Sequence, residues 1–452
     1  MQRATENLGV VLREARRRAG MTQEELSARS KLGIRTVSDL ERDRIGRPHR
    51  RTVDALVAAL GLEGAEARAF HAAARPARAG GARPDKAVVK RAANPLPAAP
   101  ADFLGREAEL DQLLTWVGYT PDLGHDPVVV SGAPGAGKTS FALHAGHRLA
   151  EMFADGQIFV SLRGLEQVPR DPHEVLGVLL GLLDAPGDHL PRTLEARVGL
   201  FRSLIRSRSV LLILDDAAGE AQVRPLLPGG GSSMVIVTSR NTLGGLDAGR
   251  RFALGRLGRS ESLRMIGQIA GWHRLAAEPP ASLELVELCG RLPLALRVAG
   301  NRLAVRPQWT IADLTRLLRD ERTRLSQLVC GDLSVRSVLL SSYALLDATG
   351  RRLFRRLALT SGTTITAPVA AALIESDADR TGRVLEKLAD ASLLEALPAG
   401  SYRLAEPLTL LAQELLSTHD EPAEILRLFA AMRTADAETQ AAGDALAGSN
   451  RP

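Results

Sequence analysis

The sequence is poor in cysteine, in aromatic residues and in long apolar runs. Its 452 residues include 2 cysteines, Cys289 and Cys330, too few for a disulfide framework or a cysteine zinc site, so we expect both to be core thiols. Aromatic residues make up 3% of the chain, which disfavours a stacking platform for single-stranded nucleic acid. The apolar run at residues 210–214 is far too short for a membrane-spanning helix. Because the first nine residues are polar and show no signal peptide, we expect a soluble, cytoplasmic protein.

The positive charge of the sequence is concentrated near its N-terminus. The whole chain has a formal net charge of +6, whereas residues 1–95 alone carry 20 Lys and Arg against 11 Asp and Glu, a net charge of +9. Residues 96–452 therefore carry a net charge of −3. A basic segment joined to a near-neutral remainder is typical of a nucleic-acid-binding module attached to a globular body. The length of 452 residues indicates about two to four domains.

A glycine-rich stretch at residues 128–140, VVVSGAPGAGKTS, has the spacing of a phosphate-binding loop. The valines predict a short buried strand, and the residues after the loop predict a helix whose positive N-terminal end faces the phosphates. The glycines let backbone N–H groups turn toward phosphate oxygens, where any Cβ would intrude. The expected nucleotide-binding residues of this loop are Gly132, Gly135, Gly137, Lys138, Thr139 and Ser140. The alternative is a glycine-rich turn that binds nothing.

Three further apolar stretches, at residues 157–164, 209–217 and 234–240, predict strands. The middle stretch, SVLLILDDA, ends on two acids, as expected where a strand places a carboxylate beside a phosphate-binding loop. We expect Thr139 and Asp215 to hold Mg²⁺, and Asp215 and Asp216 to be the catalytic candidates, with Asp216 positioning or activating water. The alternative is that the two acids only cap a helix. Strands that alternate with helical stretches predict a doubly wound parallel sheet with the nucleotide at its carboxyl ends.

The basic N-terminal segment shows helical patterns and no strand pattern. Helices are predicted from residue 8 to Gly20, from Thr22 to about Ser30, from Ile34 to about Arg42, and at 52–62. The spacing of Thr22 and Glu25 predicts a capping box, and the third helix should bury Val37 and Leu40. Two short helices joined by a tight turn inside a basic domain favour a helix-turn-helix.

The stretch GMTQEELSARSKLGIRTVSDLER resembles the lambda-repressor-like, XRE-type DNA-binding domains. The resemblance implies double-stranded DNA as a partner, with Gln23 and the later arginines at phosphates and Arg35 at a guanine edge, because its fork matches O6 and N7. The DNA-binding residues that it implies are Gln23, Arg35, Thr36, Ser38, Asp39, Arg42, Arg47 and Arg50. The alternative is a helical protein-interaction domain whose arginines are solvated surface residues.

Two further motifs lie outside the phosphate-binding loop, one before it and one well after it in the sequence. Gly105-Arg106-Glu107 precedes an amphipathic helix, and LPLAL stands at residues 292–296 within a helical stretch at 285–304. Together with the loop they resemble the NB-ARC-type ATPases of the STAND class. The resemblance implies ATP or ADP with Mg²⁺ as cofactors, Gly105 and Arg106 near the nucleotide, Pro293 on the base side and Arg240 at the γ-phosphate. The residues alone allow a helix cap with a surface arginine at 106, another surface arginine at 240, and a proline kink at 293.

Residues 333–418 resemble the winged helix of the same family, with a short hairpin around Pro398–Ser401. In that family the winged helix ends in Met-His-Asp, and the histidine contacts the β-phosphate of ADP. Here Leu404-Ala405-Glu406 stands at that place. Since a methyl group cannot hydrogen-bond a phosphate, the resemblance implies weaker ADP retention in this chain.

The expected fold is multidomain. In chain order it comprises an all-α, XRE-type helix-turn-helix domain at 1–75, a flexible linker at 76–101, an α/β P-loop nucleotide-binding domain with a parallel sheet at 102–254, a helical domain at 255–328, a winged-helix domain at 329–418 and a short helical tail at 419–452, the tail holding one or two short helices. The leading functional hypothesis is an ATP/ADP-switched, DNA-binding transcriptional regulator, at most a slow ATPase, whose nucleotide state controls opening and DNA binding. The alternatives are a signalling or defence ATPase whose N-terminal domain recruits a protein, and a metabolic P-loop enzyme. A homodimer or larger oligomer stays open, and no membrane partner is expected.

Overall fold

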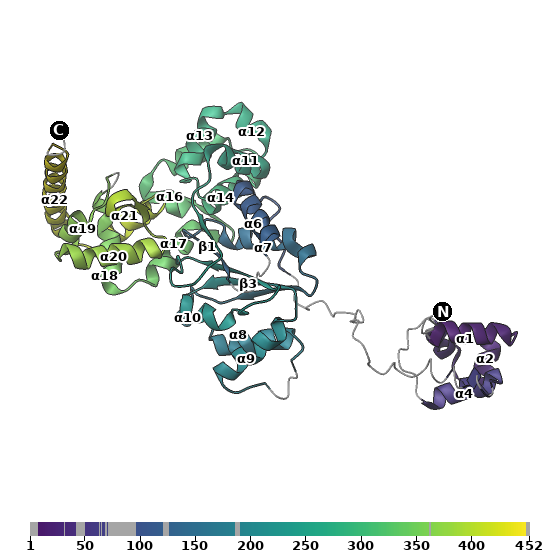
Figure 1. Cartoon of the computed structure of the whole chain (residues 1–452). Coiled ribbons are helices and arrows are strands. Elements are labelled where there is room, and N and C mark those ends of the chain that lie inside the picture. Colours follow the sequence, from purple (N-terminus) through teal and green to yellow (C-terminus); the bar gives the residue numbers. More distant parts are fainter. Residues whose placement is uncertain are drawn as a thin grey trace. The chain divides into compact units, whose positions relative to one another are not determined.

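The computed structural model describes residues 8–30, 32–41, 50–62, 64, 66–67, 70, 96–120, 126–185, 190–360 and 363–448. They fall into two compact units, Met1–Val88 and Val89–Pro452, each of which is described by itself (Figure 1). Both cysteines are free thiols. No helix in these residue ranges combines the length and apolarity needed to cross a lipid bilayer.

The described part of the first unit is helical, as the sequence predicts. Its helices are α1 (Leu8–Arg18), α2 (Gln23–Ser30), α3 (Ile34–Glu41) and α4 (Arg50–Leu60). The predicted capping box is confirmed, because the Thr22 N–H donates to Glu25 Oε2 at 2.8 Å and the Glu25 N–H donates to Thr22 Oγ1 at 3.1 Å. Val37 and Leu40 are buried in the core that joins the helices, also as predicted.

A buried carboxylate ties α3 to α1 and α2. Glu41 accepts hydrogen bonds from Arg16 Nε at 2.5 Å and from Gln23 Nε2 at 2.7 Å. Burial acts to raise the pKa of Glu41, but the hydrogen bonds from Arg16 and Gln23 outweigh it and hold the pKa below its usual value. The side chain of Gln23 is thus engaged within the unit.

The second unit is built on a parallel five-stranded sheet with the spatial order β2-β3-β4-β1-β5. The strands are β1 (Val128–Gly132), β2 (Gly156–Ser161), β3 (Val210–Ala217), β4 (Met234–Ser239) and β5 (Arg250–Leu254). The register places Val129 opposite Val237 of β4 and Arg251 of β5. Because the strands are parallel, the loops that follow β1, β3 and β4 lie at one edge of the sheet.

Alternate residues of these strands face two separate apolar cores, so the sheet is covered on both faces (Figure 1). Val128 and Val130 pack with α6 (Glu107–Tyr119) and α7 (Lys138–Leu149). Val129 packs with α8 (Pro172–Leu182) and α9 (Leu194–Ile205), and the short α10 (Glu220–Val223) follows β3.

Four of these strands were predicted from the sequence, and β5 was not. Its sequence, RRFAL, is short, and Arg250, Arg251 and Ala253 are exposed. An edge strand of this kind lacks the continuous apolar run by which buried parallel strands are identified. β5 still matters to the site, because its last residue, Leu254, packs against the start of the phosphate-binding loop.

After the sheet the chain is almost entirely helical. The helices up to residue 327 are α11 (Arg259–Ala270), α12 (Trp272–Ala277), α13 (Pro279–Leu288), α14 (Pro293–Ala304), α15 (Ile311–Leu318) and α16 (Glu321–Gln327). The expected break at Pro293 is present, but the alternative of a kink in one helix is wrong, since α13 ends at Leu288 and α14 begins at Pro293. A proline fits this first helical position because its missing N–H would have no intrahelical acceptor.

The last part of the unit combines helices with two small hairpins. Strand β6 (Val329–Cys330) pairs with β7 (Leu333–Ser334), and the predicted second hairpin is confirmed as β8 (Glu395–Leu397) paired with β9 (Ser401–Arg403). The helices are α17 (Val335–Ala344), α18 (Ala348–Arg356), α19 (Ala367–Ile374), α20 (Ala378–Asp390), α21 (Leu408–His419) and α22 (Pro422–Gly448). One apolar core runs from Leu257 to Met432 and includes residues of every helix from α11 to α22.

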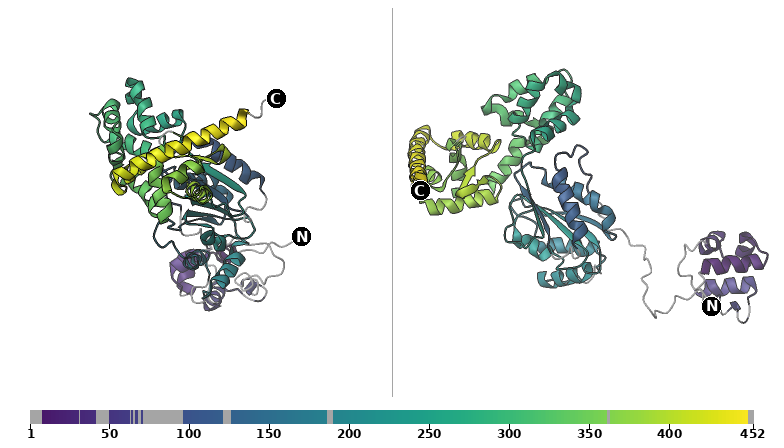
Figure 2. Two further views of the ribbon diagram at one scale, coloured as in Figure 1. Left: turned by 90° about the vertical axis from the view of Figure 1, so that its left-hand side faces the viewer. Right: turned by 45° about the horizontal axis from the view of Figure 1, so that its top comes forward.

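The prediction of one or two short helices in the tail is wrong. Helix α22 is a single helix of 27 residues on the outside of the unit (Figure 2). Its first turns bury Leu428 and Met432 in the common core. Alanine is frequent along the remainder, and its high helix propensity explains why the helix continues beyond the packed turns.

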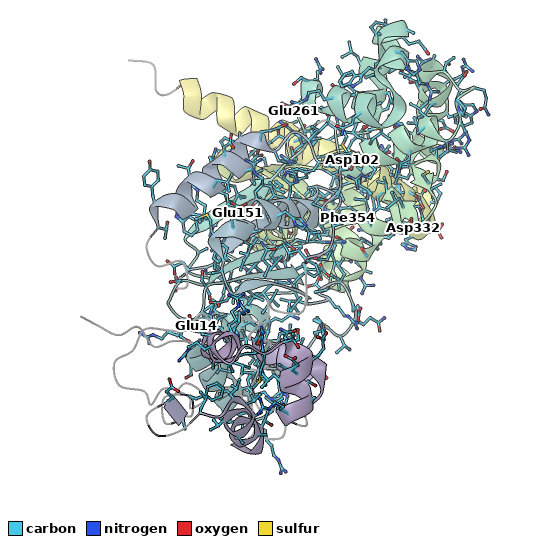
Figure 3. The ribbon with its side chains drawn as sticks, turned by 90° about the vertical axis from the view of Figure 1, so that its right-hand side faces the viewer. Glu14, Asp102, Glu151, Glu261, Asp332 and Phe354 are labelled. Carbon is cyan, nitrogen blue, oxygen red and sulfur yellow. The ribbon has the colours of Figure 1, made fainter. Side chains whose placement is uncertain are left out.

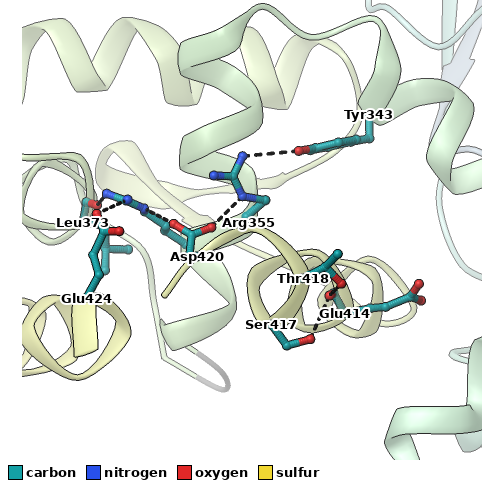
Figure 4. Close-up of polar contacts among 9 residues, drawn as sticks. Tyr343, Arg355, Leu373, Glu414, Ser417, Thr418, Asp420 and Glu424 are labelled. Carbon is teal, nitrogen blue, oxygen red and sulfur yellow. Dashed lines mark hydrogen bonds and ion pairs between the residues drawn. The ribbon is translucent and has the colours of Figure 1, made fainter. Parts of the chain in front are cut away.

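Buried ion pairs fasten the start of α22 to α18. Asp420 accepts from Arg355 Nε at 2.7 Å and from Arg356 Nε at 2.8 Å, and Arg356 also donates to Glu424 at 2.5 Å. Figure 4 shows Asp420 between the two guanidinium groups, with Tyr343 at one end of the chain of contacts and Glu424 at the other. Burial acts to raise the pKa of Asp420, yet the two arginines hold it below its usual value.

Candidate nucleotide-binding site

The loop between β1 and α7 has a backbone that only glycine adopts easily. Gly132, Gly135 and Gly137 have φ angles of 146°, 81° and 88°. A Cβ at Gly132 would lie 2.3 Å from the carbonyl oxygen of Leu254, and one at Gly135 would lie 3.0 Å from Leu294 Cβ. The backbone conformation favours glycine at all three positions, and the space available also favours it at Gly132 and Gly135. The loop ends where α7 begins, so the backbone N–H groups of the first turn of that helix are available to an anion.

Lys138, the first residue of α7, folds back over this loop. Its Nζ donates to the carbonyl oxygens of Gly132 at 2.8 Å and Ala133 at 3.0 Å. Burial, with a smaller contribution from the charge of Arg240, lowers the pKa of Lys138 to about 7. The hydrogen bonds of this half-buried amine go to carbonyl oxygens, while the charges of Asp215 and Asp216 act on it from nearby and raise its pKa in part. An anionic ligand beside Nζ would raise the pKa of Lys138 further toward its ordinary value.

Asp215 lies directly beside Thr139, as the sequence predicts for a magnesium site. Its Oδ1 accepts from Thr139 Oγ1 at 2.8 Å and from Thr238 Oγ1 at 2.6 Å. Burial raises the pKa of the Asp215 carboxyl. The described residues contain no cluster of three or more His, Cys, Asp or Glu side chains able to hold a metal alone. A carboxylate and a hydroxyl are nevertheless the protein ligands that Mg²⁺ uses when phosphates supply the others.

Asp216 occupies an irregular position in β3. Its φ of 57° lies in the left-handed region, and the pairing of β3 with β4 shifts register between Leu214 and Ala217. Its Oδ2 accepts from the Leu165 N–H at 3.2 Å. The shift turns two successive acids toward the same edge of the sheet, whereas a regular strand would direct them to opposite faces.

A cavity of about 430 Å³ joins these residues. Of the predicted site residues it is lined by Gly135, Gly137, Lys138, Thr139, Ser140, Asp215, Asp216, Arg240 and Pro293. Met265, Leu294 and Arg297 add a wall from the helical part of the chain, and Val338 adds one from α17. Cavities of this size bind small molecules, and this one combines an anion-binding loop with apolar walls.

Arg240 joins the cavity to α17. It follows β4, and its Nη1 donates to the Val338 carbonyl oxygen at 3.1 Å and to Ser342 Oγ. Its own carbonyl accepts from Ser392 Oγ at 2.7 Å. Burial lowers the pKa of Arg240 to about 10, so the group remains a cation at neutral pH. The predicted site arginine therefore lies in the cavity wall with its donors directed at another part of the unit.

Gly105 and Arg106 lie outside the main cavity. Arg106 is buried and donates to the Gly255 carbonyl oxygen and to Glu109 Oε1 at 3.1 Å. Gly105 has a φ of 76°, and a Cβ there would lie 2.7 Å from Glu261 Cβ. Arg106 lines a small adjoining cavity of about 30 Å³. Both residues thus support the wall of the site, and the sequence alternative of a surface arginine at 106 is wrong.

The pair Asp102 and Arg297 was not found from the sequence. Arg297 Nη2 donates to Asp102 Oδ1 at 2.6 Å, and both residues line the small cavity. Next to them the ring of Phe103 stacks on His144, with ring centroids 4.6 Å apart. A pair separated by 195 positions in the chain leaves no pattern in a single sequence.

A second cavity of about 310 Å³ touches the other side of the phosphate-binding loop. Gly132 and Pro134 line it, together with Leu292, Leu339 and Ala405. The structure therefore brings Ala405 close to the loop but places it in this cavity, apart from the one that contains Lys138.

The residues predicted to contact DNA are described only in part. Thr36 and Ser38 are half-buried on α3, and Gln23 is bonded to Glu41. Arg42 and Arg47, and the side chains of Arg35, Asp39 and Arg50, lie outside the described residues.

Comparison with known proteins finds one matching domain family and two longer relatives. Residues 7–70 match the family described as "Helix-turn-helix domain". The chain is 39% identical over 323 residues to the regulatory protein AfsR of Streptomyces coelicolor, covering 70% of this chain and 32% of the relative. It is 36% identical over 327 residues to the regulatory protein AfsR of Streptomyces griseus, covering 72% and 34%. The chain thus spans about a third of the length of the curated relatives it matches.

Solved structures show only distant likenesses. A Walker-type ATPase of Pyrococcus abyssi is 14% identical with a TM-score of 0.46, covering 71% of this chain and 98% of that one. A STAND protein with a tetratricopeptide repeat sensor from Pyrococcus horikoshii is 18% identical with a TM-score of 0.32, covering 77% and 50%. With TM-scores this low, neither structure adds evidence about the fold of this chain. The chain therefore joins an N-terminal segment that matches a helix-turn-helix family to a unit with a phosphate-binding loop and a parallel sheet, and it is similar to the AfsR regulatory proteins over about 70% of its own length.

Proposed function

We propose that this chain is a transcriptional regulator whose helix-turn-helix domain binds double-stranded DNA and whose second unit changes its packing between ATP and ADP. The phosphate-binding loop, the Lys138 amine bonded to its carbonyl oxygens and the cavity of about 430 Å³ support nucleotide binding. Mg²⁺ would neutralise phosphate charge at this site, and Thr139 and Asp215 are the residues that would hold it. Asp216 would position water, and slow hydrolysis would suffice for a switch.

The proposed domain boundaries follow the sequence prediction. In this proposal residues 102–254 are the nucleotide-binding domain, 255–328 a helical domain and 329–418 a winged-helix domain. The winged-helix assignment is supported by the run of α17, α18 and α20 before the hairpin of β8 and β9. The helical and winged-helix domains share one apolar core from Leu257 to Met432. Separating them would expose that core, so in this proposal the two domains move as one body.

The position of Arg240 carries the switch proposal. Its guanidinium group has acceptors on α17, the Val338 carbonyl and Ser342 Oγ, and it also lines the cavity beside Lys138 and Asp216. In a buried place an arginine interacts more strongly with an anionic oxygen than with neutral ones. Arg240 would therefore exchange its acceptors on α17 for an additional phosphate group, and α17 would lose that contact with the sheet.

The first unit supports DNA binding through its fold and charge. Its match to a helix-turn-helix family and the net charge of +9 on residues 1–95 are what a phosphate-neutralising domain requires. The helix-turn-helix domain would bind DNA as part of a dimer only when the packing of the second unit permits dimerisation. The bound nucleotide would control DNA affinity in this way.

The test measures how the bound nucleotide changes both the hydrogen exchange of α17 and the affinity for DNA. Hydrogen exchange of α17 is measured in the full chain with no nucleotide, with ADP and with ATP, and DNA affinity is measured by gel shift under the same conditions. We expect ATP to raise exchange in α17 relative to ADP and to change DNA affinity. The Arg240→Ala variant should bind nucleotide but give the same α17 exchange with either. The Ser342→Ala variant, which removes one acceptor without altering the cavity wall, should raise α17 exchange already without nucleotide.

Two results would contradict the proposal. If ADP and ATP give the same α17 exchange and the same DNA affinity in the unmodified chain, there is no nucleotide switch. If the chain shows no salt-dependent DNA binding and instead retains a protein through residues 1–75, the alternative of a signalling ATPase with a recruiting domain is correct.

A further inference from the structure

The second cavity, of about 310 Å³, lies between the phosphate-binding loop and the last part of the second unit. Residues 131–134 form one of its walls, and α17, the end of α20 and the segment before α21 form others. Six buried leucines line it, each at most 5% exposed: Leu254, Leu292, Leu339, Leu393, Leu394 and Leu408. All of them except Leu254 belong to the same apolar core as Phe354, which is labelled in Figure 3. The walls of this cavity are therefore core residues and not a shallow surface.

Small side chains leave this space unfilled. Five of the residues that line the cavity are alanines, whose single methyl groups do not reach across it: Ala133, Ala253, Ala389, Ala396 and Ala405. Protein interiors are normally close-packed, so the leucines around a space of this volume lack partners for their dispersion contacts. An apolar cavity excludes water and takes up an apolar molecule that fits it.

The charged side chains at this cavity are already paired. Of the described residues that line it, Arg256 alone is cationic, and its Nη2 donates to Glu395 Oε1 at 2.6 Å. Glu406, the other carboxylate in the lining, accepts from Arg324 Nη1 at 3.2 Å. In the main cavity, by contrast, Lys138 donates to carbonyl oxygens. An anion in the second cavity would gain a cation only by breaking the pair of Arg256 and Glu395, whereas an uncharged apolar molecule requires no such exchange.

We propose that the second cavity binds an uncharged, mainly apolar small molecule at a site separate from the one that contains Lys138. Among the described residues, none lines both cavities. The ligand would contact residues 132–134 of the loop on one side, and Leu339 of α17 and Leu393 on the other. Because it would add contacts to both walls, it would hold α17 beside the loop and lower hydrogen exchange in that helix. This inference does not depend on nucleotide binding, and it gives the unit a site for a chemical signal unlike a nucleotide.

The test uses two fluorescent probes that differ by one charged group. N-phenylnaphthylamine is uncharged and apolar, and anilinonaphthalene sulfonate has the same rings with an added sulfonate. Each probe is titrated into the full chain, and hydrogen exchange of α17 is measured with and without the uncharged probe in the absence of nucleotide. We expect the uncharged probe to bind at least about tenfold more tightly than the sulfonate, because burying an unpaired charge costs more than that factor. It should also lower exchange in α17, and ADP should not displace it.

Ala389 and Ala391 provide a matched pair of variants. Both are half-buried alanines at the end of α20 and both pack against the common core, but only Ala389 lines the second cavity. Ala389→Leu should weaken binding of the uncharged probe by about tenfold or more, because the added carbons occupy the space that the probe needs. Ala391→Leu should leave that affinity unchanged. Ala405→Leu fills the cavity from another wall and should act as Ala389→Leu does, so the test does not depend on the folding of one variant.

Several results would overturn the inference. It fails if the uncharged probe does not bind, if the sulfonate binds as tightly, or if exchange in α17 is the same with and without the probe. Displacement of the probe by ADP would place it in the main cavity. Equal probe affinities for Ala389→Leu, Ala405→Leu and Ala391→Leu would place it elsewhere on the chain. A chain that binds the probe as expected but binds no ADP would support this inference and contradict the nucleotide site proposed above.

Discussion

Nucleotide affinity should depend on pH through Lys138. In the nucleotide-free protein burial lowers the pKa of this lysine to about 7, and the groups that face it are Arg240, which lowers the pKa, and Asp215 and Asp216, which raise it. A bound phosphate adds negative charge beside Nζ and returns the pKa toward its ordinary value near 10.5. Above pH 7 each nucleotide that binds should therefore bring a proton with it.

The magnitude follows from the pKa of about 7. At pH 8.5 such a group is about 97% neutral, so binding should take up about one proton. The dissociation constant should rise about 15-fold between pH 7.0 and pH 8.5, because the neutral form must first be protonated. The folding stability of the free protein should change with pH in the opposite direction to nucleotide affinity. Lys138 binds its proton more tightly in the unfolded chain, so its contribution to the free energy of unfolding rises with pH between about 7 and 10.5.

Calorimetry at pH 8.5 in two buffers of different ionisation enthalpy measures the proton uptake directly. All nucleotide phosphates are ionised at that pH, so they contribute no proton. The control is Lys138→Arg, whose side chain stays charged and should show weak binding with no proton uptake. If the unmodified protein takes up less than about 0.2 proton and its affinity does not change between pH 7.0 and 8.5, Lys138 is already charged in the free protein and the reasoning is wrong.

Three further predictions concern other parts of the chain. Ala405→His should raise the ratio of ADP to ATP affinity, measured by calorimetry, by about 10–150-fold if residue 405 reaches the β-phosphate. An unchanged ratio would mean that residue 405 contacts only the second cavity, which it lines, and not the nucleotide. Asp420→Asn removes the carboxylate that half-buried Arg355 and buried Arg356 share, and only Arg356 keeps a second carboxylate partner, Glu424. The substitution should destabilise the docking of α22 by about 3–5 kcal/mol and raise hydrogen exchange in its first turns, and equal exchange in both proteins would show that this network does not hold the helix. In the unmodified chain the same docking should weaken as the pH falls through the lowered pKa of Asp420. Thr22→Ala removes the capping box and should lower the unfolding free energy of the first unit by about 0.5–2 kcal/mol in a thermal melt, whereas Thr418→Ala, on the second unit, should leave that transition unchanged.

Local patterns allowed much of this structure to be predicted. The phosphate-binding loop, the strand that ends in Asp215 and the capping box at Thr22 depend on residues close together in the chain, and each is present. Asp215 could be assigned beside Thr139 because parallel strands end at one edge of the sheet. Of the two short hairpins, the second was predicted around Pro398–Ser401. The first was not, because β6 and β7 have 2 residues each and show no periodicity.

Contacts between distant segments could not be predicted. The direction of the Arg240 side chain depends on α17, about a hundred positions later, and the pairing of Arg297 with Asp102 depends on how α14 packs beside the segment before α6. Nothing in the neighbouring residues of either arginine indicates its acceptor. The sequence predicts one or two short helices where the single helix α22 lies. Its later turns owe their helical form to the propensity of alanine and not to an amphipathic pattern, so the pattern did not indicate its length.

The segment from Leu96 to Arg106 has a mechanical consequence. Within eleven positions it packs Leu96 against α7 at Gly146, accepts a hydrogen bond from His147 through the Pro97 carbonyl when that ring nitrogen is protonated, pairs Asp102 with α14, and anchors Arg106 at Gly255. A pulling force applied to the chain before Leu96 is therefore borne first by α7 and α14, two of the helices that line the main cavity. A ligand that contacts both helices should raise the force at which this segment detaches, so the mechanical stability of the segment should depend on whether the cavity is occupied.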